Sequence, residues 1–188
     1  YLYTSPFDVV LDPFAGGGST VDICKKRFRR YFVSDRKPIV EREKEIRQHD
    51  LKDGPLKPPQ WKDVKLLYLD PPYWIQASGQ YSDDADDLAN QSLDDFTANL
   101  SRIVKQYAAK MSDAYIALII QPTQWKAPDR AFVVDHVGDL LRLVKLPVEM
   151  RYSVPYEPQQ CNAQMVEWAK DAKRCLVLSR EIIVWGVK

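Results

Sequence analysis

The chain of 188 residues is long enough to bury a hydrophobic core as one globular domain and too short for two full domains. No run approaches the ~20 apolar residues that a membrane helix needs, and no charged leader before an apolar stretch opens the sequence. We therefore expect a cytoplasmic protein without a membrane partner. The formal net charge of +1 excludes the overall basic character of many nucleic-acid binders, so any contact with DNA must come from a local face.

Cysteine and histidine are too few and too scattered to predict a metal site. Cys24, Cys161 and Cys175 are an odd number without CxxC spacing, which favours reduced thiols over a disulfide framework. His49 and His136 lie far apart in the sequence, and we expect structural or surface roles for both. The sequence thus predicts no metal ligand.

Apolar runs that end in polar or glycine-rich turns alternate with helical patterns along the chain. We expect strands at residues 7–11, 31–34, 64–69, 115–120 and 148–154, a brief one ending near 49–50, and further strand at 176–178 and 182–185. We expect helices after the glycine cluster, from Pro38 through 41–47, over 96–111 and over 133–144, the first of them capped by Ser19 or Thr20. This alternation predicts a single α/β domain with a β-rich end.

Polar residues and a glycine cluster stand at the ends of the first expected strands, the edge at which open α/β sheets bind ligands. Gly16, Gly17 and Gly18 allow a tight turn and a close approach of the backbone to a ligand, although such a turn can also serve packing alone. Their spacing is not that of a Walker-type ATP site. Asp35, after the second strand, is placed to accept hydrogen bonds from ribose hydroxyls, or else to cap a turn. Asp50 ends the third.

The residues Asp70, Pro71, Pro72 and Tyr73 directly follow the clearest strand. The two prolines prevent the strand from continuing, so a carboxylate, a carbonyl group and an aromatic ring meet at one point. Such a group can hold a planar amine. The alternative is a proline-stiffened turn.

Residues 12–20, Asp-Pro-Phe-Ala-Gly-Gly-Gly-Ser-Thr, resemble the cofactor motif of amino-group DNA methyltransferases, and residues 70–73 resemble their catalytic motif. The motif order is similar to the arrangement called alpha or gamma in that family, and residues 180–185 resemble the last hairpin of its sheet. The resemblance implies a Rossmann-like α/β fold with a seven-stranded, mostly parallel sheet, a C-terminal antiparallel hairpin and helices on both faces. It also implies methyl transfer from S-adenosylmethionine to the exocyclic amine of a flipped base in double-stranded DNA, leaving S-adenosylhomocysteine.

The functional residues follow from the same resemblance. Those implied for the cofactor are Asp12, Pro13, Phe14, Ala15, Gly16 and Gly18 in the loop, Asp35 at the ribose and Asp50 near the adenine amine. Those implied for catalysis are Asp70, Pro71, Pro72 and Tyr73. Asp rather than Ser before the two prolines resembles adenine enzymes more than cytosine-N4 enzymes, so N6 of adenine is the expected acceptor.

The chemistry of an aryl amine suggests a mechanism, because its lone pair is delocalised into the base and is a poor nucleophile. The Asp70 carboxylate and the Pro71 carbonyl can accept hydrogen bonds from the amine and favour a tetrahedral nitrogen aligned with the methyl group. Tyr73 is the expected stacking platform for the flipped base, with Trp74 assisting.

Several polar segments are candidates for contact with DNA. The loops at residues 76–81, 121–130 and 156–164 combine Gln, Asn and aromatic residues with Lys126 and Arg130, a mixture suited to bases and phosphates but also common in ordinary loops. The basic residues at 25–30 are expected on a solvated face away from the strand ends. The acidic stretch at 83–87 would repel phosphate, so we expect it to face solvent or to order on binding.

Two alternatives stay open. RNA base-amine methyltransferases also combine a glycine loop with a Pro-Pro-aromatic motif, but usually add an RNA-binding domain. A catalytically silent, methyltransferase-like DNA-binding subunit is the other, and the intact residues 70–73 argue against it. The chain begins at Tyr1 without a methionine and contains no target-recognition domain of the usual size, so we expect one catalytic domain, residues 1–188, truncated at its N-terminus. The recognition sequence, the oligomeric state and any accompanying restriction enzyme are not predicted.

Overall fold

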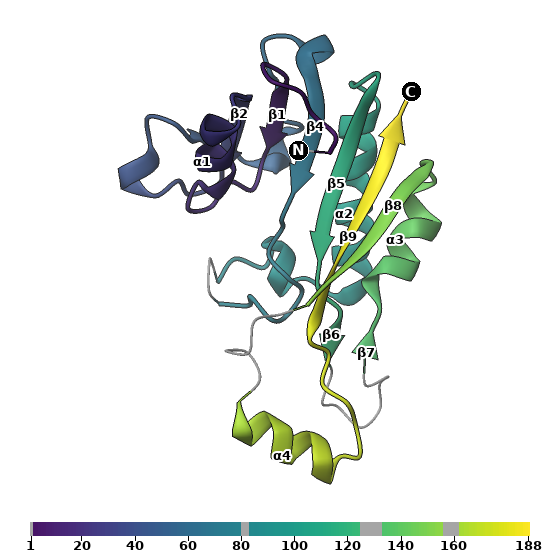
Figure 1. Ribbon diagram of the computed structural model, residues 1–188. Coiled ribbons are helices and arrows are strands. Elements are labelled where there is room, and N and C mark those ends of the chain that lie inside the picture. The colour runs from purple at the N-terminus through teal and green to yellow at the C-terminus, as the bar shows by residue number, and fades with distance from the viewer. Residues whose placement is uncertain (1, 80–82, 125–132, 156–161) are drawn as a thin grey trace.

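A single large sheet forms the centre of the molecule. The computed structural model describes residues 2–79, 83–124, 133–155 and 162–188. The strands of the sheet are β1 (Val9–Asp12), β2 (Arg30–Asp35), β3 (Arg47–Gln48), β4 (Val64–Leu69), β5 (Ala114–Ile120), β8 (Val148–Pro155) and β9 (Ser179–Val187). Their order is β3-β2-β1-β4-β5-β9-β8, with β9 antiparallel to both of its neighbours and the other pairs parallel (Figure 1).

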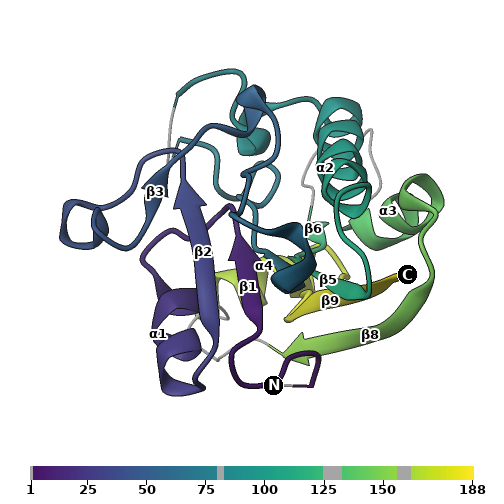
Figure 2. The ribbon, with the colours of Figure 1, turned by 90° about the horizontal axis from the view of Figure 1, so that it is seen from above.

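Helices cover the two faces of this sheet unequally. The helices are α1 (Ser19–Lys26), α2 (Leu93–Ala108), α3 (His136–Val144) and α4 (Ala163–Asp171). The α1 helix lies on one face beside β2, whereas α2 and α3 pack together on the opposite face behind β5 and β9 (Figure 2). The expected seven-stranded, mostly parallel sheet with an antiparallel C-terminal hairpin and helices on both faces is therefore confirmed.

The hydrophobic core is concentrated on the face that carries α2 and α3. Leu67 of β4, Leu118 of β5 and Trp185 of β9 are completely buried there against Phe96 and Leu140 of the two helices. Because β4 and β5 are central strands, their sequences are almost continuously apolar, as parallel-sheet burial requires. On the α1 side, a much smaller cluster joins the glycine loop to β2. Its buried members are Ala15, Val21, Val33 and Ile46.

Some of the expected elements are wrong in position. Residues 41–47 do not form a helix, because only a 3₁₀ turn at Val40–Arg42 fits before β3 begins at Arg47. The α2 helix ends at Ala108, three residues before Met111. The α3 helix begins at His136 rather than at residue 133, because the carboxylate of Asp135 caps it by accepting from the Val137 amide at 3.0 Å.

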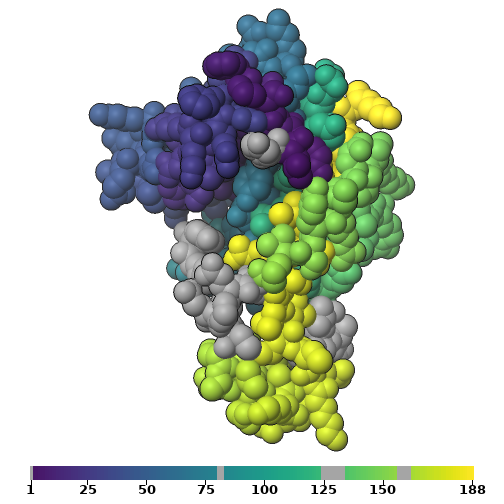
Figure 3. Space-filling view, viewed as in Figure 1, coloured from purple at the N-terminus to yellow at the C-terminus, as the bar shows by residue number. Residues whose placement is uncertain are grey.

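The connection between the two strands of the C-terminal hairpin also differs from the expected one. These strands are β8 and β9, whose register pairs Met150 with Val184 and Tyr152 with Ile182. The expected strand at residues 176–178 is absent, since β9 begins at Ser179. The α4 helix is inserted between the two strands and projects from the carboxyl edge of the parallel strands (Figures 1 and 3).

A separate two-stranded ribbon pairs β6 (Thr123–Gln124) with β7 (Val133–Val134), directly after β5. Within the described ranges, no helix combines the length and the apolar character that a membrane crossing requires.

Candidate active site

The glycine-rich loop between β1 and α1 is held against the neighbouring strand. The Ala15 amide donates to the Ser34 carbonyl of β2 at 2.9 Å, and the Gly18 amide closes a turn onto the Ala15 carbonyl at 2.8 Å. Gly18 has a φ of +89°, and a Cβ atom there would lie 3.4 Å from Nε of Arg42. The backbone conformation at residue 18 therefore favours glycine, whereas the contact with Arg42 is an ordinary van der Waals distance.

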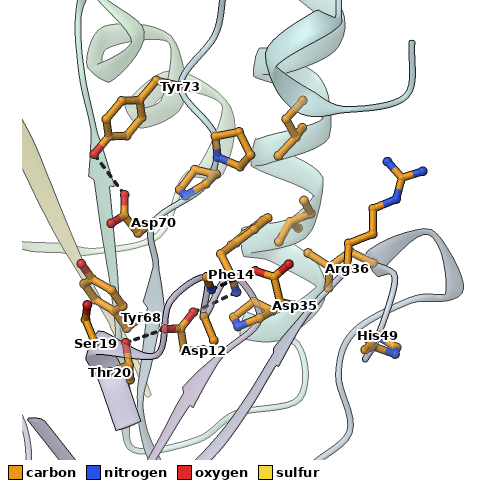
Figure 4. A pocket seen from close by; sticks show the side chains of 18 of the residues that line it. Asp12, Phe14, Ser19, Thr20, Asp35, Arg36, His49, Tyr68, Asp70 and Tyr73 are labelled. Atoms are coloured by element: carbon orange, nitrogen blue, oxygen red, sulfur yellow. Dashed lines mark hydrogen bonds between the residues drawn. The ribbon is translucent and has the colours of Figure 1, made fainter. Parts of the chain in front are cut away.

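Asp12 holds the inner end of this loop. Its carboxylate is buried and accepts a hydrogen bond from the Phe14 amide at 2.8 Å and another from the Thr20 hydroxyl at 2.5 Å (Figure 4). Burial raises the pKa of Asp12 to about 6, against these two hydrogen bonds, which lower it. The expectation that Ser19 or Thr20 caps α1 is wrong. Gly18 is the N-cap residue and makes no side-chain hydrogen bond, and the Thr20 hydroxyl donates to Asp12 instead.

Asp35 is the last residue of β2, and Asp50 follows β3 by two residues. Asp35 accepts from the Gly16 amide and from the Lys37 amide, each at 2.9 Å, through its two oxygens. Asp50 accepts from the Lys52 amide at 2.9 Å. Each carboxylate oxygen has a further lone pair, so both side chains can still accept hydrogen bonds from a ligand.

An ionic cluster joins this edge to the acidic stretch. Arg36 pairs with Asp50 at 3.2 Å and also with Asp84, and Lys52 pairs with Asp86 at 2.6 Å. The acidic stretch thus faces solvent only in part. Two cations beside the cavity bind it, while Asp83, Ala85 and Asp86 are exposed, as the expectation of a solvent-facing stretch requires.

The second motif forms the opposite wall. The loop leaves β4 after Leu69, and the Tyr73 hydroxyl donates to Oδ1 of Asp70 at 3.0 Å (Figure 4). Burial raises the pKa of Asp70, whereas this hydrogen bond and the nearby charge of Arg180 lower it. Trp74 does not assist Tyr73 as expected, because its side chain is buried and its indole nitrogen donates to the Gln91 carbonyl at 2.9 Å.

One cavity of about 1250 Å³ joins the two motifs. It brings together eleven of the twelve predicted site residues. These are Asp12, Pro13, Phe14, Ala15, Gly16, Asp35, Asp50, Asp70, Pro71, Pro72 and Tyr73. Gly18 does not line the cavity and contributes only by shaping the loop.

Other residues of the cavity were not predicted as site residues. Tyr68 and Arg180 line it, and the position of Tyr68 on the same face of β4 as Asp70 follows from strand alternation, which could have revealed it. Arg27 and Arg29 also line part of it, although they lie between α1 and the amino end of β2, away from the carboxyl edge as expected. Lys25, in contrast, is a half-exposed partner of Glu45, as a solvated face predicts.

A polar network of His136, Thr123 and Gln76 packs against Trp74, the residue that follows the Asp-Pro-Pro-Tyr loop. Nε2 of His136 lies 2.9 Å from the Thr123 hydroxyl, which also accepts from Nε2 of the Gln76 side chain at 3.2 Å. The imidazole packs edge-on against Trp74, with ring centroids 5.8 Å apart. Burial lowers the pKa of His136 to about 4, so this histidine is a neutral structural residue near pH 7. His49 lies at the cavity, where its Nε2 is 2.9 Å from the Gly54 carbonyl.

The candidate DNA loops are described only in part. Gln76 and Gln121 line the cavity. Lys126, Arg130 and most of the segment 156–164 lie outside the described residues. Among the residues that are described, no three His, Cys, Asp or Glu side chains are grouped as a metal site would require.

Comparisons with known proteins support the fold. No protein-family model matches the chain, and no curated protein matches its sequence. Among solved structures, a SAM dependent methyltransferase from Archaeoglobus fulgidus aligns with a TM-score of 0.55 at 11% identity, over 98% of this chain and 88% of that one. A TehB-like SAM-dependent methyltransferase from Corynebacterium glutamicum aligns with a TM-score of 0.51 at 13% identity, over 98% and 83%.

A third similar structure contains bound ligands. It is the 1,6-didemethyltoxoflavin-N1-methyltransferase from Burkholderia thailandensis with bound 1,6-didemethyltoxoflavin and S-adenosylhomocysteine, with a TM-score of 0.55 at 14% identity, over 97% of this chain and 72% of that one. At such identities the likeness concerns the fold alone. The chain has the Rossmann-like fold of S-adenosylmethionine-dependent methyltransferases.

Proposed function

We propose that this chain is an S-adenosylmethionine-dependent methyltransferase that modifies the exocyclic amine of a flipped base in double-stranded DNA, with N6 of adenine as the acceptor. The observation that carries the proposal is the meeting of a glycine-rich loop and an Asp-Pro-Pro-Tyr loop in one cavity at the carboxyl edge of the sheet. The first loop suits a nucleoside cofactor and the second suits a planar amine.

The residues of the cavity fit S-adenosylmethionine. The backbone at Gly16 and Gly17 is open to a ligand, since a Cβ atom at either position would meet nothing within 4 Å. Asp35 and Asp50 offer acceptors for the ribose hydroxyls and the adenine amine. The same cavity also contains the Asp-Pro-Pro-Tyr loop, so an acceptor can lie beside the cofactor. The cofactor supplies an electrophilic methyl group on a positively charged sulfur.

Asp70 and Pro71 act on the acceptor amine. The carboxylate of Asp70 and the carbonyl of Pro71 accept hydrogen bonds from its two N–H groups, which concentrates the lone pair on nitrogen. Bound S-adenosylmethionine would supply the methyl group to this nitrogen, and its sulfur would keep the electron pair of the carbon–sulfur bond. The nitrogen loses one proton to the Asp70 carboxylate, so no covalent enzyme intermediate is needed.

Tyr73 supports the choice of a base as the acceptor. Its ring lies next to Asp70 in the cavity, and stacking on an aromatic ring contributes about 1–3 kcal/mol for each base. A base inside a duplex cannot reach this cavity, so it must be flipped out. The aspartate before the two prolines favours adenine, by its resemblance to the adenine enzymes.

The test is product analysis with a matched pair of variants. Wild type, Asp70→Ala and Asp113→Ala are incubated with S-adenosylmethionine and unmethylated DNA or RNA, and the nucleosides are identified by mass spectrometry. Asp113 is a control for loss of a carboxylate, because it is 97% exposed and lies outside the cavity. We expect N6-methyladenine in DNA from wild type and Asp113→Ala, and a loss of at least a thousandfold in Asp70→Ala.

The other outcomes contradict parts of the proposal in different ways. N4-methylcytosine would correct the acceptor base and keep the mechanism. Methylation of RNA alone would overturn the assignment of DNA. No product on either polymer, although S-adenosylmethionine binds, would favour a small-molecule acceptor, and no binding of the cofactor would favour a silent methyltransferase-like subunit.

A further inference from the structure

Arg180 reaches the candidate site from a distant part of the sequence. It is the second residue of β9, which runs antiparallel to β5 and pairs Glu181 with Ile120 at the end of that strand. The start of β9 therefore lies at the carboxyl edge of β4 and β5, where Asp70 and Tyr73 are found. Neither of the two recognisable motifs contains Arg180.

The side chain of Arg180 contacts the aromatic ring of the catalytic loop. Its guanidinium carbon lies 5.3 Å from the centroid of the Tyr73 ring, within the ~6 Å over which a cation is attracted by an aromatic face. Tyr73 in turn donates its hydroxyl to Asp70. A cation, a phenol and a carboxylate are therefore connected in a row along one wall of the cavity.

The charges around Asp70 give Arg180 a second effect. Tyr73 faces Asp70 with its hydroxyl, and Arg180 faces it with a positive charge; both lower the pKa of the carboxyl against its burial. Asp12 faces it from β1 as a second buried acid, and Tyr68 lies on the same strand as a neutral phenol whose own pKa is raised. Of these four neighbours, Arg180 is the one that carries a positive charge.

We propose that Arg180 is a positioning residue of the transfer site, which holds Tyr73 by one face of its ring and stabilises the ionised form of Asp70. The proposal rests on the proposed function of the same site. Because the guanidinium occupies one face of the ring, the flipped base stacks on the opposite face, and its amine meets a carboxylate that is ready to accept hydrogen bonds. Arg180 thereby fixes the side from which the acceptor enters.

The test compares Arg180→Gln, Arg180→Lys and a control, Arg151→Gln. Arg151 is a matched control, because it lies on the adjacent strand β8 and pairs with Glu181 at 2.9 Å, outside the cavity. The pKa of Asp70 is measured by NMR of the ¹³C-labelled carboxyl group, which requires neither cofactor nor acceptor. We expect Arg180→Gln to raise this pKa by about one pH unit, and Arg180→Lys and Arg151→Gln to leave it close to the wild-type value.

The second readout is the pH profile of single-turnover methylation of unmethylated DNA. We expect the acidic limb of the Arg180→Gln profile to move upwards by the same amount, so that the rate falls by up to about tenfold on that limb and recovers at higher pH. A merely structural role would lower the rate equally at every pH and leave the Asp70 titration unchanged, and this result would overturn the proposal. A changed titration without any methylated base from wild type would contradict the proposed function and still support the role of Arg180.

Discussion

The two halves of the cavity are held in different ways. The catalytic half, with β4, β5, α2 and α3, rests on a large apolar core, and a neutral, buried His136 supports its loop from behind. The cofactor half, with β1, β2 and β3, contributes Leu11 to that core, but its loops rest on a small apolar cluster and on hydrogen bonds and ion pairs of Asp12, Asp35 and Arg36.

We infer from this difference that the catalytic half contributes more to the stability of the fold and the cofactor half more to ligand binding. A cooperative apolar core resists small perturbations and keeps Asp70 and Tyr73 in place. A polar loop network is more sensitive to salt, to pH and to single hydrogen bonds. We therefore expect mutations in the first half to change the free energy of unfolding, and mutations in the second half to change the affinity for the cofactor.

The largest expected effect comes from the same truncation made in each half. Ile116→Ala opens a cavity in the main core and should lower the free energy of unfolding by about 3–5 kcal/mol, since Ile116 is fully buried. Ile46→Ala, beside the glycine loop, should cost about 2 kcal/mol because the small cluster can relax. Urea denaturation measures both. Equal losses would contradict the contrast between the halves.

The next effect concerns pH, because each half contains a buried titratable group. His136 has a pKa lowered from 6.5 to about 4, so its contribution to stability is present above pH 6.5 and is lost as the pH falls towards 4. Asp12 has a pKa raised from 3.8 to about 6, so its destabilising charge is present above pH 6 and is relieved as the pH falls towards 3.8. The two effects have opposite signs and partly cancel.

Asp12→Asn should remove the gain in stability that wild type obtains when Asp12 is protonated at low pH. Between pH 7 and pH 4.5 the variant should lose about 2 kcal/mol more unfolding free energy than wild type, because the loss from His136 is no longer offset. Denaturation curves at the two pH values provide the measurement. Parallel changes in wild type and variant would show that Asp12 does not titrate in this range.

A smaller effect is expected from the geometry of the glycine loop. Gly18→Ala places a side chain at a φ of +89° beside Arg42 and Ile46, which costs about 1–2 kcal/mol. If the loop must keep this conformation to bind S-adenosylmethionine, the same cost weakens binding by roughly tenfold. Gly138→Ala is the control, because Gly138 lies outside the cavity, its φ is not positive, and a Cβ atom there would come no closer than 3.9 Å to Asp135. Calorimetric titration of both variants tests the difference, which should be absent if the loop does not hold the cofactor.

The smallest expected effect is that of the ionic cluster. Arg36→Gln removes the pairs with Asp50 and Asp84, which are partly exposed and contribute about 0–1 kcal/mol each. We expect a loss of a few-fold in cofactor affinity and a weaker dependence of that affinity on salt. If the salt dependence of Arg36→Gln equals that of wild type, the cluster does not contribute to cofactor binding.

Local sequence signals predicted the sheet and the two motifs that the cavity joins. Residues 64–69 were predicted to be a strand because a buried parallel strand is a continuous apolar run, and the two prolines after Asp70 mark its end. Residues 41–47 were predicted to be a helix and instead form a turn that leads into β3. The contact that holds Arg42 in this turn is with Asp22, 20 residues away, and no local pattern reveals it. Arg180 lies far from the catalytic motif in sequence, and no local pattern marks such a contact.

The most direct test of the account follows the methyl group to its nitrogen. Wild type and Asp70→Ala are incubated with S-adenosylmethionine carrying a ¹³C methyl group and with duplex DNA in which N6 of adenine is ¹⁵N. We expect a ¹³C–¹⁵N coupling in the DNA treated with wild type and none after Asp70→Ala, while both proteins bind the cofactor with similar affinity. Binding of the cofactor by wild type without any ¹³C–¹⁵N bond in the DNA would contradict the assignment of N6 of adenine in DNA as the acceptor.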